Sequence, residues 1–336
     1  MNKDCYIIAE AGVNHNGSLD LAKELVLKAK VAGADAVKLQ SFKASSLVTQ
    51  RAKKVGYQQE TTEGGDDQLS MLKALELTRD EQQMLFQFGR SKGIDIFSTA
   101  FDLESLDYLS SLEPPLYKVP SGEITNVPML QQLGKLGKPV IVSTGMATLG
   151  EVDFALQVLL AGGLMREEIT VLHCSTQYPT PMEDVNLRAM LTLESAFPGV
   201  NVGYSDHTRG VEVAVAAVAL GATVIEKHFT LDQSMEGPDH RASLEPEELA
   251  QMVSSIRNVT AALGDGFKAP TRQELLNRNG VRKSIVASVE IRKGETLNEQ
   301  NLTTKRPASG IPANRWNEVL GRPACRDFAA DECIEW

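Results

Sequence analysis

Two histidines, His207 and His228, occupy the same place in consecutive copies of one local pattern. "NVGYSDHTRG" and "TVIEKHFTLD" are apolar runs that end in polar residues including a histidine, and the chain has only five histidines. If the runs are neighbouring strands, their ends lie about 5 Å apart, so two imidazoles can share one metal ion. A lone histidine is more often a hydrogen-bonded side chain than a ligand, but carboxylates of Glu10, Asp206 and Glu226 are expected nearby. Two nitrogen ligands with water completing the shell favour Mn²⁺ or Mg²⁺ over a closed zinc site.

Two lysines indicate an anion site. Lys38 and Lys118 stand near the ends of expected strands, and an ammonium group there is costly to desolvate unless an anion pairs with it. Residues 143–145, "STG", are expected to open the next helix, and a helix N-terminus is a natural anion site. The alternative is an ion pair with Glu10 or Glu123. The two lysines and the expected helix N-terminus together favour a phosphate or carboxylate ligand.

The elements that would position these residues repeat along the chain. From residue 5 to about 263, short β-branched runs alternate with amphipathic helical stretches, which predicts a parallel sheet. The expected strands are "CYIIAE", "DAVKLQ", "DIFSTAF", "LYKVPS", "PVIVSTG", "ITVLHCS", "VNVGYSD" and "TVIEKHFT". Eight repeats of this length predict a closed (β/α)8 TIM barrel, whose active site lies at the carboxyl ends of the strands. An open doubly wound sheet is the alternative, but "EAGVNHNG" is not its GxGxxG turn.

The extent of the strand–helix alternation predicts three parts of the chain. We predict a catalytic barrel over residues 1–263, a linker over 264–284 and a small β-rich domain over 285–336. The last part is too small to be more than marginally stable alone, so we expect it to lean on a larger body. Within the barrel, residues 41–70 are polar without clear periodicity, which is typical of a functional or disordered loop.

Composition excludes several classes of function. The formal net charge of −10 argues against a nucleic-acid or anionic-membrane surface. No apolar stretch approaches the roughly 20 residues that span a bilayer, and the start lacks a secretory signal. The four cysteines form no CxxC pair, which is typical of reduced thiols in the cytosol. We therefore expect a cytoplasmic protein that binds neither nucleic acid nor membrane.

Many short motifs together resemble the sialic acid synthase family. They are "AEAGVNHNG", "VKLQSFKA", "FSTAFD", "YKVPSGEITN", "VSTGMAT", "YPTP", "GYSDHT", "EKHFTLD", "GPDH" and "KRPASGI". The resemblance implies a TIM barrel followed by an antifreeze-like (SAF) domain, in a homodimer whose swapped antifreeze-like domains cover the partner's barrel. It also implies a transferase that condenses phosphoenolpyruvate with an N-acylated mannosamine-type sugar and water, releasing phosphate.

The same resemblance implies roles for individual residues. Those for phosphoenolpyruvate are Lys38, Thr99, Lys118, Ser121, Ser143, Ser205 and Thr176, the last where some relatives have Asn. His207 and His228 would bind the divalent metal, with Mn²⁺ first and Mg²⁺ or Co²⁺ as alternatives, and Glu10 would act near the metal-bound water or hydroxyl. Those for the sugar are Gln40, Glu123, Tyr178 and Asp239, with Arg306 reaching the N-acyl group from the other subunit.

The choice of sugar and two other functions stay open. The main interpretation is N-acetylneuraminate synthesis from N-acetylmannosamine. "KLQSFKA", "FDLES", "PSGEITN" and "GPDHRASLEPEEL" are also similar to legionaminic acid synthases, whose sugar is a 2,4-diacetamido-2,4,6-trideoxymannose. A Schiff-base aldolase with Lys118 or Lys38 as nucleophile is a more distant alternative. All eight expected strands end in polar residues, which a non-enzymatic ice- or carbohydrate-binding protein would not need.

Overall fold

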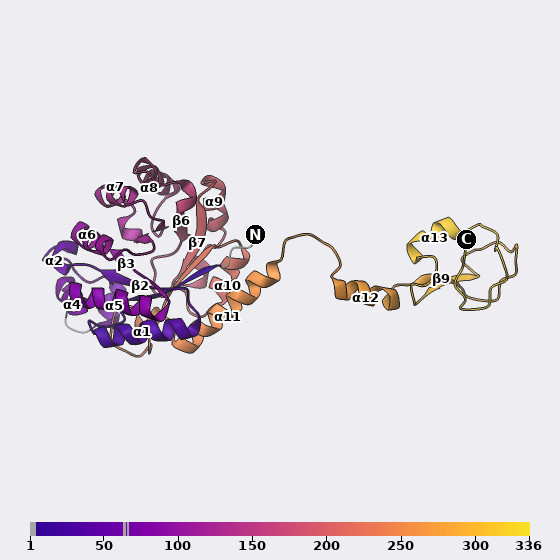
Figure 1. The fold of residues 1–336 in the computed structure, drawn as a ribbon, viewed down its shortest axis with the longest axis horizontal. Helices are drawn as coiled ribbons and strands as arrows, with labels where there is room; N and C mark the ends of the chain where they lie inside the picture. Colours follow the sequence, from indigo (N-terminus) through magenta and orange to yellow (C-terminus); the bar gives the residue numbers. More distant parts are fainter. Residues whose placement is uncertain (1–4, 63–64, 66) are drawn as a thin grey trace. The chain divides into compact units, whose positions relative to one another are not determined.

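The computed structural model describes residues 5–62, 65 and 67–336. These residues form two compact units, Met1–Asp265 and Gly266–Trp336. The first holds the eight expected strands, and the second holds the remainder of the chain (Figure 1). No helix in the described part of the chain is both long and apolar enough to cross a membrane.

All eight predicted strands are present and pair in parallel around a closed barrel, in the order of the sequence (Figure 1). β1 pairs with both β2 and β8, which closes the ring. The strands are β1 (Tyr6–Gly12), β2 (Ala36–Ser41), β3 (Asp95–Ala100), β4 (Tyr117–Val119), β5 (Val140–Ser143), β6 (Ile169–His173), β7 (Asn201–Asp206) and β8 (Val224–His228). The predicted (β/α)8 barrel is confirmed, and the open doubly wound alternative is wrong.

Helices surround the strands and pack their apolar faces on the barrel. They are α1 (Leu19–Ala32), α5 (Arg79–Lys92), α6 (Leu103–Ser111), α7 (Val127–Lys135), α8 (Leu149–Ala161), α9 (Ala189–Ala196), α10 (Glu212–Ala219) and α11 (Pro246–Leu263). Short 3-10 helices lie at η1 (Ser121–Glu123), η2 (Arg166–Glu168), η3 (Met182–Asp184) and η4 (His240–Ala242). Local sequence fixes the helix ends: the Ser18 side chain caps α1, and Gly33 ends it in the left-handed conformation.

The segment between β2 and α5 is not the irregular loop that the sequence predicted. It contains three short helices, α2 (Ala44–Leu47), α3 (Gly56–Thr61) and α4 (Gln68–Leu75), whereas residues 63, 64 and 66 of the predicted loop lie outside the described residues. Its buried residues Phe42, Ala44, Leu72 and Leu75 pack with Val13 in a cluster of their own. We call the described residues of this segment, 42–62, 65 and 67–75, the β2–α5 insert. It has its own small core, which the short helices made hard to detect by periodicity.

The barrel interior is layered, and the layers decide where the chemistry lies. Apolar side chains fill its lower part, and they are Ile8, Ala36, Phe97, Ile141, Leu172 and Val224, with Leu116 against them. Side chains of a strand return to the same face every second residue. The next inward positions are therefore Glu10, Lys38, Thr99, Ser143, Cys174, Glu226 and Lys118. A polar layer thus lies directly above an apolar plug, at the carboxyl ends of the strands.

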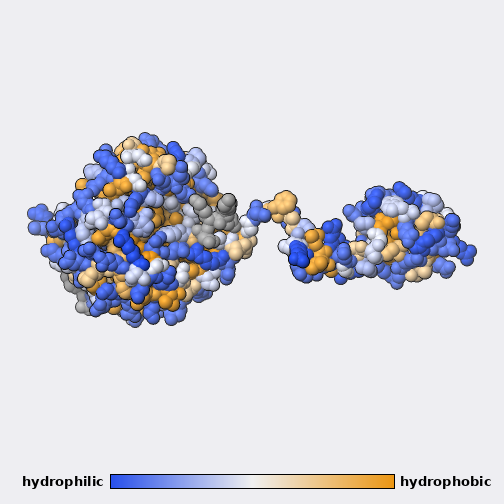
Figure 2. All heavy atoms as spheres, in the orientation of Figure 1, coloured by the Kyte–Doolittle hydropathy of each residue, from blue (hydrophilic) through white to orange (hydrophobic). Residues whose placement is uncertain are grey.

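The second unit has a small core of its own. The elements of this unit are α12 (Arg272–Val281), the antiparallel strands β9 (Ser284–Ala287) and β10 (Leu302–Lys305), η5 (Ala313–Arg315) and α13 (Trp316–Val319). The predicted linker, residues 264–284, therefore includes a helix. Leu275, Leu276 and Val281 of α12 are exposed apolar residues. Figure 2 shows hydrophobic surface, in orange, over this segment of the chain. These three side chains point to different sides of the helix, so α12 carries scattered exposed apolar residues and no single apolar face.

Candidate active site

A cavity of about 500 Å³ opens above the polar layer of the barrel. Its wall includes thirteen of the residues that the sequence analysis singled out: Glu10, Lys38, Gln40, Thr99, Lys118, Ser121, Ser143, Thr176, Tyr178, Ser205, His207, His228 and Asp239. They come from all eight strands or the turns that follow them. The barrel therefore brings together residues that are up to 229 positions apart in the sequence.

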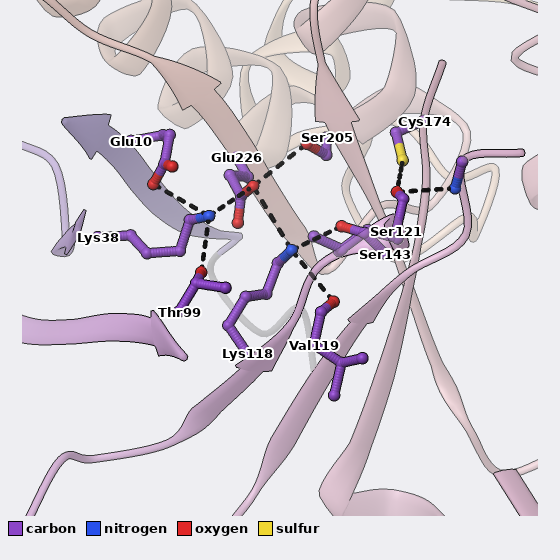
Figure 3. Close-up of polar contacts among 12 residues, drawn as sticks. Glu10, Lys38, Thr99, Lys118, Val119, Ser121, Ser143, Cys174, Ser205 and Glu226 are labelled. Atoms are coloured by element: carbon purple, nitrogen blue, oxygen red, sulfur yellow. Dashed lines mark hydrogen bonds and ion pairs between the residues drawn. The ribbon is translucent and has the colours of Figure 1, made fainter. Parts of the chain in front are cut away.

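Two lysines and two glutamates form the centre of the polar layer (Figure 3). The Lys38 Nζ atom lies 3.0 Å from Glu10 Oε2 and 3.3 Å from Glu226 Oε1. The Lys118 Nζ atom lies 3.7 Å from the same Glu226 oxygen and donates to Ser143 Oγ at 2.7 Å. Glu226 thus lies between the two ammonium groups. The predicted ion pair of Lys38 with Glu10 is present, but the partner of Lys118 is Glu226 and not Glu123.

Burial and neighbouring charges shift the pKa values of these groups. Burial raises the pKa of Glu10 to about 7, against the attraction of Lys38. Burial alone would also raise the pKa of Glu226, but Lys118 and Lys38 outweigh it and hold that pKa below its usual value. Burial lowers the pKa of Lys118, whereas Glu10 and Glu226 outweigh burial at Lys38 and raise its pKa. Of the two carboxyl groups, Glu10 is therefore the one able to exchange a proton near neutral pH.

The expected helix N-terminus at residues 143–145 is wrong. Ser143 ends β5, and α8 begins only at Leu149, where the Thr148 side chain and Glu151 form a capping box. The intervening residues form a turn because the Thr144 N–H and hydroxyl group both donate to the Leu172 carbonyl. The positive end of α8 is therefore not at the end of β5, and the donors there are Lys118 and the hydroxyl groups of Ser143 and Thr144.

The turn after β5 packs tightly against two other predicted residues. A Cβ atom added at Gly145 would lie 2.8 Å from Ser121 Oγ and 2.7 Å from Thr176 Cγ2. The Gly145 N–H donates to Ser121 Oγ at 3.0 Å. The absence of a side chain at Gly145 thus lets Ser121 and Thr176 approach the end of β5, where both line the cavity.

The two predicted ligand histidines lie side by side. Their ring centroids are 5.4 Å apart, and the Tyr178 ring stacks on His207 at 4.3 Å. The His207 Nδ1 atom bonds to the Ser175 carbonyl, which can only accept. His207 therefore carries its proton on Nδ1 and leaves Nε2 with a lone pair, the arrangement usual for a metal-bound imidazole.

These residues fit a divalent metal ion. The buried His228 Nδ1 atom has no hydrogen-bond partner, and Asp239 Oδ2 lies 3.9 Å away from it. Burial lowers the pKa of His207 to about 4 and the pKa of His228 well below its ordinary value, so both rings are neutral and can donate a lone pair. Among the described residues no group of three or more His, Cys, Asp or Glu side chains is placed to hold a metal ion, so the protein would supply the two histidines alone. A metal would therefore keep open positions for water or substrate.

Two predicted site residues are not in the wall of the cavity. Glu123 lies in η1 and accepts a hydrogen bond from Asn126 Nδ2 at 2.6 Å. Arg306 belongs to the second unit, directly after β10, and its predicted role requires a second subunit. Both roles stay predictions.

The site also contains groups that the sequence analysis did not include among its site residues. Glu226 was noted only as a nearby carboxylate, although it bridges both lysines and accepts from Ser205 Oγ at 3.3 Å. The signal was present, because Glu226 and His228 are two residues apart and share one face of β8. The apolar part of the cavity wall, which the β2–α5 insert supplies, had no such signal.

A buried ion pair supports the two histidine-bearing segments from outside the cavity. The Lys227 Nζ atom lies 2.8 Å from Asp206 Oδ2, and both side chains are fully buried. Lys227 also donates to the Thr208 carbonyl, and Asp206 Oδ1 accepts from the Thr208 N–H and hydroxyl group. Asp206 precedes His207 and Lys227 precedes His228, so these bonds hold the two histidine-bearing segments together through Thr208.

Lys227→Met should therefore destabilise the barrel strongly. The variant leaves the Asp206 carboxylate buried without its counter-ion, and breaking a buried pair in this way costs about 3–5 kcal/mol. The matched control is Lys43→Met, because the pair of Lys43 with Glu104 is more than half exposed and exposed pairs contribute about 0–1 kcal/mol. Urea denaturation of both variants measures the difference, and equal free energies of unfolding would contradict it.

The chain is similar to known proteins along nearly its whole length. Residues 25–268 match the model of the NeuB family, and residues 282–336 match that of the SAF domain. The N,N'-diacetyllegionaminic acid synthases of Campylobacter jejuni and Legionella pneumophila are 53% and 45% identical, covering 99% of this chain and 99% and 94% of theirs. The crystal structure of N-acetylneuraminic acid (sialic acid) synthetase from Leptospira borgpetersenii superposes with a TM-score of 0.72. It is 32% identical and the match covers 83% of this chain and 93% of that one.

Proposed function

Because this chain belongs to the NeuB family, we propose that it condenses phosphoenolpyruvate with 2,4-diacetamido-2,4,6-trideoxymannose and water to form N,N'-diacetyllegionaminic acid and phosphate. The resemblance to legionaminic acid synthases at 53% and 45% identity supports this sugar over N-acetylmannosamine, since the sialic acid synthetase is 32% identical. The observation that carries the reaction class is the layer of buried lysines beside two neutral histidines.

The lysines bind the phosphate and carboxylate of phosphoenolpyruvate. Lys38, Lys118 and Ser143 present donors to one end of the cavity, and the layer carries surplus positive charge whenever Glu10, whose pKa burial raises to about 7, is protonated. An anion in the cavity can accept a charge-assisted hydrogen bond from each ammonium group while both lysines stay beside Glu226, because an ammonium group has three N–H donors. The fully buried position of these groups supports anion binding, because solvent does not compete.

The histidines face the aldehyde of the open-chain sugar. His207 and His228 would hold the divalent ion, which when bound supplies Lewis-acid polarisation of the carbonyl. C3 of phosphoenolpyruvate then forms a bond to the aldehyde carbon, whose oxygen takes up a proton. Tyr178 stacks on His207 and Asp239 lies beside His228, so both residues orient the imidazoles and the sugar.

Glu10 handles the proton of the water that completes the reaction. The new C–C bond uses the C2–C3 π electrons and leaves C2 electron-poor, so water adds at C2 and gives up one proton. The C–O bond to phosphate then breaks, and the remaining hydroxyl proton leaves with the phosphate as C2 becomes the ketone. Glu10, with its pKa raised to about 7 by burial, accepts the first of these protons on its carboxylate. Gln40 Nε2 donates to Glu10 Oε1 at 3.1 Å and fixes the orientation of the group.

The choice of sugar is tested directly by comparing both substrates. With phosphoenolpyruvate saturating, kcat/KM for 2,4-diacetamido-2,4,6-trideoxymannose should exceed that for N-acetylmannosamine by at least about tenfold, measured as phosphate release. A higher kcat/KM for N-acetylmannosamine would instead favour the N-acetylneuraminate synthase interpretation. If no phosphate were released with either sugar, the whole reaction class would be wrong.

We also propose a homodimer in which Arg306 completes the partner's sugar site. The resemblance to the sialic acid synthase family supports this arrangement. A guanidinium group beside an N-acyl carbonyl would donate hydrogen bonds that a solvated arginine does not make.

Complementation between two inactive chains tests that arrangement. His228→Ala and Arg306→Ala should each be nearly inactive alone, whereas co-expression should restore activity, with about a quarter of all sites intact after random pairing. If Arg306 served its own barrel, every site of the mixed dimer would carry one defect. Mixed dimers as inactive as either parent would therefore rule out the shared site.

A further inference from the structure

The cavity has two ends of different chemistry. Its base is the layer of lysines, glutamates and hydroxyl groups, whereas its outer wall is largely apolar. The apolar side chains of the β2–α5 insert that line the cavity are Phe42, Leu47, Val48, Val55, Met71, Leu72 and Leu75. The base must hold the reacting atoms, so the apolar wall is left for the part of the sugar that does not react.

The insert holds this wall in a defined position. Phe42 and Phe101 pack edge to face with centroids 6.2 Å apart, next to buried Leu72 and Leu75. At the start of α2, the backbone N–H of Lys43 donates to Asp102 Oδ2 at 3.1 Å. The buried side chains form the support, while Leu47, Val48 and Met71 are only partly buried and keep surface free.

Two amides lie within the apolar wall. Gln58 and Gln68 line the cavity, and Gln68 Nε2 donates to Gln58 Oε1 at 3.2 Å. Gln58 Oε1 also accepts from the Val55 N–H, so its orientation is fixed by two bonds. A wall of methyl groups with an oriented amide matches an acetamido group, which has a methyl on one side and an amide on the other.

The length of the sugar matches this division. When C1 reacts at the base, C6 lies up to roughly 6 Å further out, because five C–C bonds of about 1.5 Å separate them. The trideoxy sugar presents a methyl at C6 and an acetamido group at C4, whereas N-acetylmannosamine presents hydroxyl groups at both positions. A hydroxyl group against leucine, valine and methionine loses its hydrogen bonds to water without replacement.

We propose that the β2–α5 insert is the specificity element of this enzyme, with Leu47, Val48 and Met71 contacting the C6 methyl and C4 acetamido groups of the sugar. The inference rests on the proposed function, since it explains how the site distinguishes two sugars that react at the same carbon. The lysines and histidines serve both sugars equally, so selectivity resides in the wall.

Polar substitution in the wall tests this assignment. Met71→Gln keeps the length of the side chain and should lower kcat/KM for the diacetamido sugar by about tenfold or more, with kcat/KM for N-acetylmannosamine changed less than about threefold. The KM for phosphoenolpyruvate should stay the same. Met84→Gln is the matched control, because Met84 is an exposed residue of α5 outside the cavity wall, and it should change none of these values.

Val48→Thr guards against misfolding of the first variant. Threonine has almost the shape of valine, so the fold is retained while a methyl group becomes a hydroxyl group, and the ratio of the two kcat/KM values should again fall. A wild-type enzyme that prefers the diacetamido sugar, with an unchanged ratio in both variants, would overturn the inference and leave the proposed function intact. A wild-type preference for N-acetylmannosamine would overturn the proposed function itself.

Discussion

Chelation of divalent metal ions should abolish phosphate release by this enzyme, and Mn²⁺ or Mg²⁺ should restore it. The reason is the pair of neutral, buried imidazoles whose ring centroids are 5.4 Å apart. Neither can act as a general acid near neutral pH, because burial lowers both pKa values far below it. Neutral imidazoles side by side can hold a metal ion through their ring nitrogens, which is the role we assign to them. Full activity in a metal-free, chelated sample would contradict this.

His207→Ala and His228→Ala should each lose at least about a hundredfold in turnover, since even groups that only orient metal ligands are worth about 10–100-fold. The same variants should bind Mn²⁺ more weakly, measured by electron paramagnetic resonance of the free ion and independently of activity. His173→Ala is the matched control, because His173 bonds to the Val185 carbonyl and does not line the cavity. Unchanged Mn²⁺ binding in both ligand variants would refute the assignment.

Lys118→Ala should raise the KM for phosphoenolpyruvate by about 30-fold to several thousandfold and leave the KM for the sugar within a few fold. The substitution removes one side of a desolvated charge contact, which costs about 2–5 kcal/mol, or 1.4 kcal/mol for each factor of ten. Lys118→Met keeps the apolar stem and should show the same effect, which separates lost charge from lost packing. Lys135→Ala on the exposed face of α7 should change nothing.

Two outcomes would count against this role of Lys118. An unchanged KM and kcat for phosphoenolpyruvate in both variants would refute anion binding. Covalent trapping of the wild-type lysine by borohydride in the presence of a keto acid, together with activity that chelators do not affect, would favour the Schiff-base alternative. We expect neither, because the Lys118 ammonium group is already hydrogen-bonded to Ser143 and faces Glu226.

The sequence alone determined the barrel and most residues of its polar layer. β-branched runs that recur with helical stretches between them specify parallel strands, and each strand carries its apolar and polar positions with a period of two. The carboxyl ends of parallel strands meet at one end of a barrel. Residues as distant as Glu10 and His228 could therefore be assigned to one site without knowledge of the coordinates.

Only the tertiary structure decided which of these groups touch. The period of two predicts that Glu226 points into the barrel. Only the closure of the barrel shows that the Glu226 carboxylate, and not that of Glu123, lies beside Lys38 and Lys118. The start of α8 at Leu149 depends on the Thr148 cap and on Thr144 bonding across to β6, whereas the motif "STG" is compatible with either a turn or a helix. The helices of the β2–α5 insert are four to eight residues long, too short to be stable or recognisable alone. Packing against Val13 and Phe101, which lie in other parts of the sequence, holds α2 and α4 in place.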